Sequence, residues 1–434
     1  MSFRLQILCW FFPPAANICS LHAPGFRTAQ VCMPLWEAPF GMKPGMLNSD
    51  AGREMTISRR DQSRQLYFVS PVIDFAFIGG LSIATFILLR VFYTQERTPL
   101  VIQVAAGLVW ICNWPHFAAT NYRLYHSRAN ISQYPFTALL VPWIILLGVC
   151  ASIASPELIA PYFVKLFLIW SPYHFSGQTV GITLVYARRA GCVIDKLPRL
   201  ALSTFVFGTF LSQTVRSEVF PEGAEFYGIR YPGLGLPEWS ITFASAVMVL
   251  GGIGFAAFVV RWSLQNKRLL PPIVLLPALA QFVWFVRAST WLSFTEFVPF
   301  FHSLQYLLIA WSMQLKEKMD LRQITPSRKY VFTESLRWGA INFLGGAVLF
   351  SLLPFTITRI AGLPSNFATA IVITAVQMHH FFVDGVIWKL KRKTVSSPLL
   401  VNISDLINPE PAICPAPHLQ LKTGVKSNPQ RQKV

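Results

Sequence analysis

The sequence predicts an all-α, polytopic integral membrane helix bundle of about ten transmembrane helices, with both termini cytoplasmic. Three observations lead to this fold class. Of the 434 residues, 53% are hydrophobic and only 13% are charged, whereas soluble domains carry roughly 25% charged residues. Apolar runs long enough to cross about 30 Å of hydrocarbon recur along the chain. Lys and Arg gather in every second connection between these runs. The lipid bilayer is therefore the expected partner.

The net charge of +18 and the pI near 9.9 would favour a nucleic-acid partner in a soluble chain. Here the basic residues stand in short segments between apolar runs, and the mean hydropathy is +0.47. We therefore expect no nucleic-acid partner. The seven Cys are scattered and form no CxxC pair, so the sequence predicts neither disulfides nor a zinc site.

Residues 1–54 are expected to be a non-native or disordered N-terminal extension. They mix Cys, Pro and short apolar patches without lasting helical periodicity. Met55 opens a basic lead directly before the first strong apolar run and would be a natural start. A signal peptide is the alternative, which the single early basic residue Arg4 and the Pro13-Pro14 pair disfavour.

Residues 55–393 are predicted to form one ten-helix transmembrane domain. A crossing needs about 20 predominantly apolar residues. The two runs near 270–288 and 292–313 are expected to form a tight hairpin. The ten runs fall near 69–93, 99–122, 135–154, 158–187, 198–215, 239–260, 270–288, 292–313, 338–359 and 367–388.

The distribution of Lys and Arg tests this helix count. The N-terminal lead and every second connection hold twenty-three Lys and Arg, and the alternate connections hold five. A helix count wrong by one in the middle would break this alternation, so the bias supports ten helices with both ends inside. The bias also favours the cell membrane, specifically a bacterial inner membrane, as the location of this multi-pass protein.

Two polar regions complete the predicted organisation. The outer loop 216–238 carries four Glu with several Gly and Pro, and we expect it to form a small external cap. Residues 394–434 are polar and Pro-rich, which predicts a disordered cytoplasmic tail. Asp74, early in the first run, is expected to form a structural ion pair, for example with Arg123.

Histidines inside the apolar runs are the most informative feature for function. Five of the eight His lie there: His116, His174, His302, His379 and His380. Ionisable side chains in the bilayer are costly and usually face the bundle interior in a functional role. A neutral imidazole is also the form that binds metal.

The predicted topology places these histidines at similar depth. They lie on the second, fourth, eighth and tenth runs, which all cross from outside to inside. His116 is 7 residues from the inner boundary at Arg123, and His174 is 14 residues from Arg188. At 1.5 Å per residue the depths span roughly 10 to 21 Å, so one layer could hold all of them.

Polar residues three or four positions away share a helical face with these histidines. Such residues orient an imidazole through its second nitrogen or line a wet cavity. The strongest local motif is His380-Phe-Phe-Val-Asp384, whose carboxylate could bond the imidazole or bind metal itself. The full set is Asn113, Thr120, Gln178, Gln305 and Asp384.

The first functional hypothesis is a metal-dependent membrane oxidoreductase acting on a lipophilic small molecule. The histidines would hold non-haem iron or another transition metal, and haem between two His is the alternative. Histidines drawn from four helices resemble those of the polytopic Brp/Blh-type carotenoid dioxygenases, whose members bind iron through histidines spread over helices. The resemblance covers the helical core from 69 to 390 and lies in arrangement, not in sequence patterns. The HxxxH and HxxHH boxes of membrane desaturases are missing.

Two other hypotheses stay open on the sequence. In a proton-coupled transporter or permease, His, Gln, Asp74 and Asp384 would line a midplane cavity and relay protons. In a membrane protein of structural role, the histidines would form hydrogen bonds between helices and perform no catalysis. Metal stoichiometry separates the first hypothesis from both.

Overall fold

The computed structural model describes residues 66–220, 224–288, 292–325, 327–388 and 402–403. These all belong to one compact unit, Ile57–Val434. The described residues are almost entirely helical, which confirms the predicted all-α class. Their strands are a two-residue antiparallel pair, β1 (Glu225–Phe226) and β2 (Ile229–Arg230). The expected extension 1–54, and all but two residues of the expected tail 394–434, lie outside the described residues.

The first half of the unit consists of helices interrupted by short π-helical and 3-10 turns. In chain order they are α2 (Pro71–Phe75), η2 (Ala76–Gly80), α3 (Leu81–Phe92), η3 (Gln95–Arg97), α4 (Thr98–Leu108), η4 (Val109–Asn113), α5 (Trp114–Tyr125), α6 (Arg128–Gln133), η5 (Phe136–Leu140), α7 (Val141–Ala154), α8 (Ala160–Arg189) and α9 (Lys196–Val219).

The second half follows the β1–β2 pair. Its elements are α10 (Trp239–Asn266), α11 (Pro272–Phe282), η6 (Val283–Arg287), α12 (Leu292–Thr295), α13 (Val298–Arg322), α14 (Arg328–Ala347), η7 (Val348–Leu352), α15 (Leu353–Ala361) and α16 (Ser365–Ile387).

Six helical stretches of the described chain are long and apolar enough to cross a membrane. They are Pro71–Phe92, Gln95–Tyr125, Phe136–Ala154, Trp239–Asn266, Arg328–Ala361 and Ser365–Ile387. The chain is therefore a membrane protein by the character of its helices. Each of the ten predicted runs coincides with helix, while ten crossings and cytoplasmic termini stay predictions. Helices α8 and α13 are more polar than these six and bury much of their length against other helices, where polar groups find partners.

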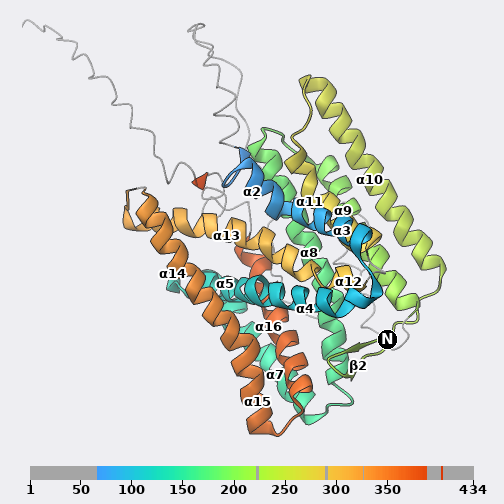
Figure 1. Ribbon diagram of the computed structural model, residues 1–434, viewed down its shortest axis with the longest axis vertical. Coiled ribbons are helices and arrows are strands. Elements are labelled where there is room, and N and C mark those ends of the chain that lie inside the picture. The colour runs from blue at the N-terminus through green and yellow to red at the C-terminus, as the bar shows by residue number, and fades with distance from the viewer. Residues whose placement is uncertain (1–65, 221–223, 289–291, 326, 389–401, 404–434) are drawn as a thin grey trace, which may run out of the picture. The chain divides into compact units, whose positions relative to one another are not determined.

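The helices that carry the histidines pack against one another. Helix α16 contacts α5, α7 and α8, and α13 contacts both α5 and the π-helical turn η4 that precedes it. Helix α10 packs along α9, as Figure 1 shows, and α14 contacts α5.

A close backbone approach sets the position of α5. A Cβ atom added to Gly346 of α14 would lie 2.7 Å from the carbonyl carbon of Trp114. Real Cβ atoms essentially never come this close, so only Gly fits. The approach occurs two residues before His116, and it fixes the start of the α5 segment that presents this histidine.

The structure corrects the expected role of Asp74. Its carboxylate accepts hydrogen bonds from the backbone N–H of Phe68 at 2.5 Å and from the Tyr186 hydroxyl at 2.8 Å, while Arg123 pairs with Glu317 at 2.7 Å. The carboxylate pairs with N–H groups in the chain that leads into α2, including that of the N-cap residue Ser70 at 3.2 Å. Asp74 therefore fixes the chain entry to α2.

The loop at 216–238 folds back onto the helix ends. Glu218 forms an ion pair with Lys165 of α8 and accepts a hydrogen bond from the Leu234 N–H at 2.8 Å. Ile229 is buried in a cluster with residues of α8 and α16. The loop thus covers these helix ends, consistent with the compact cap expected for it.

Candidate functional site: a four-histidine cluster

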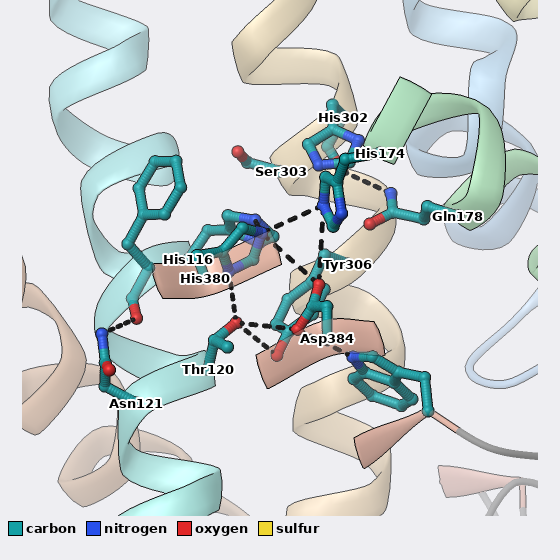
Figure 2. Close-up of polar contacts among 12 residues, drawn as sticks. His116, Thr120, Asn121, His174, Gln178, His302, Ser303, Tyr306, His380 and Asp384 are labelled. Atoms are coloured by element: carbon teal, nitrogen blue, oxygen red, sulfur yellow. Dashed lines mark hydrogen bonds and ion pairs between the residues drawn. The ribbon is translucent and has the colours of Figure 1, made fainter. Parts of the chain in front are cut away.

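Four histidines from four helices meet in the interior. His116 of α5, His174 of α8, His302 of α13 and His380 of α16 each offer one ring nitrogen, and these nitrogens all lie within 4.8 Å of one another. Figure 2 shows the rings turned toward a common point. The structure therefore brings four of the five predicted histidines together, while their common depth in a bilayer stays a prediction.

Two contacts within the cluster cannot both be hydrogen bonds. The Nε2 atom of His380 lies 3.0 Å from Nε2 of His116 and 3.1 Å from Nε2 of His174. A ring nitrogen has either one N–H or one in-plane lone pair, so it serves one such partner well. Three nitrogens that converge in this way match the lone pairs of ligands around a shared cation.

His302 adds buried nitrogens that lack partners. Within the described part of the chain, neither ring nitrogen of His302 has a hydrogen-bond partner, and the same holds for Nδ1 of His116. Leaving a buried polar atom unsatisfied costs about 1–3 kcal/mol. The His302 ring is held in place by stacking on Phe175, with centroids 3.9 Å apart. A rigid, unpaired imidazole beside the other three is consistent with a ligand.

The spacings fit a transition-metal ion. With metal–nitrogen bonds of about 2.1 Å, adjacent octahedral ligands lie about 3.0 Å apart and opposite ones about 4.2 Å. The contacts of 3.0 and 3.1 Å match the adjacent spacing. The widest separation of 4.8 Å means that binding would draw the histidines inward by several tenths of an ångström.

Asp384 approaches the cluster with one carboxylate oxygen. Its Oδ2 atom lies 3.4 Å from Nε2 of His380 and 3.6 Å from Nε2 of His174. Its Oδ1 atom accepts hydrogen bonds from the Thr120 hydroxyl at 3.3 Å and from the Trp388 indole at 3.2 Å. Hydrogen bonds thus hold Oδ1 in place. Oδ2 faces the histidine nitrogens, where it would be a fifth ligand atom beside the four ring nitrogens.

Thr120 orients His380. Its hydroxyl lies 3.0 Å from Nδ1 of His380 and 2.7 Å from the hydroxyl of Tyr306. A proton on Nδ1, donated to Thr120, leaves Nε2 unprotonated and directed at the other histidines. This is the usual way in which an outer hydrogen bond selects the metal-binding tautomer.

The other predicted polar neighbours bond away from the imidazoles. Asn113 accepts a hydrogen bond from Ser303 at 2.7 Å. Gln178 donates to the backbone carbonyl of His302 at 3.0 Å and to Gln305 at 3.3 Å. Gln305 donates to the Ile78 carbonyl at 2.5 Å. These side chains tie the histidine helices together.

His379 lies apart from the four. Its Nε2 atom is 3.1 Å from the Tyr125 hydroxyl, and the two rings stack. Because consecutive helix residues point about 100° apart, only one of the His379-His380 pair can face the cluster. The structure brings His380 to it.

Irregular helix geometry precedes two of the histidines. The π-helical turn η4 ends at Asn113, immediately before the Trp114-Pro115-His116 sequence. In α8, Pro172 lies two residues before His174, and its carbonyl accepts a hydrogen bond from Ser176 at 2.9 Å. Proline and π turns both perturb the regular hydrogen-bond ladder, and π turns are frequent at functional sites.

A cavity of about 310 Å³ opens directly beside the cluster, with His174 and Asp384 in its wall. Most of the other lining side chains are apolar or aromatic, as in pockets that bind small molecules.

Comparisons with known proteins add no family to this geometry. No protein-family model matches the chain, and no curated protein or solved structure matches it.

Two residues of the site were missed by the sequence reasoning. The ring of Tyr306 lies 4.1 Å from that of His116, between centroids, and Trp388 donates to Asp384. Tyr306 is four residues after His302, and Trp388 is four after Asp384, so the helical spacing used for the polar neighbours would have found both.

Replacing Thr120 by Val is expected to weaken metal binding roughly 10- to 100-fold, the usual effect of losing an outer hydrogen bond to a ligand. Thr120→Ser keeps the hydroxyl and should restore binding. Competition titration with a chelator of known affinity measures the effect. Equal affinities for the Val and Ser variants would show that the hydroxyl does not orient His380.

Proposed function

We propose that the protein is an integral membrane, metal-dependent oxidoreductase that acts on a lipophilic substrate. Its centre is one non-haem iron or another transition-metal ion held by His116, His174, His302 and His380. The observation that carries the proposal is the convergence of three Nε2 atoms on one point, which hydrogen bonds alone do not satisfy.

The donor set suits a redox-active transition metal. Imidazole suits iron, copper and zinc, and the Asp384 carboxylate would offset part of the charge of a divalent ion. Four imidazoles and one carboxylate leave one octahedral position open, where a bound metal of this kind supports oxygen chemistry. The open position would be reached from the cavity, whose wall includes His174 and Asp384.

The arrangement disfavours the haem alternative. Haem with two axial histidines needs a flat gap between them for the macrocycle. Here the ring centroids of His116 and His174 lie 4.5 and 4.7 Å from that of His380, with the rings edge to face. A bare ion fits between such rings, while a porphyrin would have to displace at least one helix.

The membrane arrangement that accompanies this function has ten crossings, both termini in the cytoplasm and a location in the cell membrane. It is supported by the alternation of Lys and Arg. The histidine cluster supports it as well, because its four histidines lie on runs that this topology predicts to cross the membrane in the same direction. Like the Brp/Blh-type dioxygenases, the chain would combine histidines from separate helices around a lipophilic substrate.

Nitric oxide binding tests the open metal position. Purified, reduced protein kept without oxygen should give the spin-3/2 resonance signal of a non-haem iron nitrosyl. In a separate assay in air-saturated buffer, oxygen uptake should rise when a membrane lipid extract is added. Folded protein that holds no transition metal would contradict the proposal and leave transport or a structural role. A haem-type nitrosyl signal would contradict the four-histidine centre.

A further inference from the structure

We infer that the cavity beside His174 binds a single unbranched hydrocarbon chain of a membrane lipid, which enters sideways between α9 and α16. Binding of the hydrocarbon chain does not depend on the proposed function. Only a reaction of that hydrocarbon chain beside the metal rests on it.

The cavity is elongated. One face of α8 lines it from Trp170 to Val185, a distance of about 22 Å at 1.5 Å per residue. Its volume of about 310 Å³ lies along that length, so its shape suits an extended hydrocarbon chain better than a broad, fused-ring lipid.

Glycines provide the room. Gly177 and Gly181 of α8 and Gly385 of α16 line the cavity, and a Cβ atom added to any of them would meet nothing within 4 Å. Glycine in a helix interior costs about 1 kcal/mol relative to Ala. No neighbouring atom requires these three residues to be glycine. Their missing side chains leave an open trough, the part of the cavity lined by these three glycines.

The trough opens to the side of the helix bundle. Gly177 and Gly385 are exposed, and Tyr173 is 37% exposed. Phe207 of α9 and Phe381 of α16 stand on either side of α8 as walls. In the proposed ten-crossing arrangement an opening along the length of these helices faces lipid, so a lipid chain can enter without crossing water.

The polar groups of the lining lie near the metal-binding histidines. His174 and Asp384 belong to the cluster, and Gln178 and Tyr306 bond to residues around it. No Lys or Arg belongs to the described lining, so a charged headgroup would find no counter-charge inside. The headgroup therefore stays outside, and the hydrocarbon portion passes beside the cluster.

Photo-cross-linking of the purified full chain tests this inference. The probe is a straight-chain fatty acid with a diazirine near its methyl end, and labelled peptides are mapped by mass spectrometry. We expect labels on 170–185 and 381–388. Gly181→Leu should reduce them about tenfold, because its side chain occupies the trough. The control is Gly107→Leu on α4, an exposed helical glycine whose Cβ, like that of Gly181, would meet nothing within 4 Å.

Three outcomes decide the inference. Equal labelling of the two Leu variants overturns it, as does stronger labelling by a branched polyisoprenoid diazirine than by the straight chain. Labelling retained in a metal-free His380→Ala variant supports the chain-binding trough even where the redox proposal fails, so the two failures are distinguishable.

Discussion

Replacing His380 with Ala is expected to reduce the bound metal from about one ion per chain to background. Its Nε2 atom is the one that makes both close contacts, at 3.0 Å to His116 and 3.1 Å to His174. Without the His380 imidazole, the ion loses the ligand that lies between His116 and His174, and these two histidines lose their shared neighbour. Elemental analysis of the detergent-purified protein measures the change.

His379→Ala is the matched control, since it removes an imidazole from the adjacent residue of the same helix. His379 contacts Tyr125 and lies outside the cluster, so this variant should keep its metal. Metal retained in His380→Ala, or lost equally from both variants, would contradict the assignment of ligands.

Replacing Gly346 with Leu is expected to displace α5 and release the metal. A Cβ atom at this position would lie 2.7 Å from the Trp114 carbonyl carbon and 2.9 Å from the Pro115 nitrogen. Backbone cannot yield as a flexible side chain does, so we expect a loss of stability of about 1–3 kcal/mol or more. The movement reaches His116 directly, because this histidine follows Pro115.

Gly339→Leu on the same helix is the control for this change. Gly339 is exposed, and a Cβ there would meet nothing within 4 Å. Thermal unfolding in detergent, read together with metal content, should distinguish the two variants. Equal unfolding temperatures and equal metal content would rule out the close approach as the feature that positions His116.

The sequence predicted the site layer because membrane topology restricts depth. Basic residues mark the inner ends of the runs, and a helix rises 1.5 Å per residue, so the position of each histidine along the bilayer normal follows from counting. That reasoning found His116, His174 and His302. It kept both His379 and His380, because depth alone does not say which way a helix is rotated.

Rotation and helix order in space depend on packing, which one sequence does not specify. The approach of Gly346 to Trp114 restricts the position of α5, and α16 packs against α5, α7 and α8 with His380 on the side of the cluster. For the same reason Asn113 and Gln178 were taken as partners of their own histidines. In the structure Asn113 bonds to Ser303, and Gln178 bonds to the backbone of His302.

The central claim is that four imidazoles from four helices hold one metal ion, and X-ray absorption spectroscopy of the purified full chain tests it most directly. The account predicts a single first-row transition metal with about four imidazole nitrogens near 2.1 Å, one further oxygen and no sulfur neighbour. Folded protein with no metal, or a metal surrounded by sulfur or by porphyrin nitrogens, would contradict it.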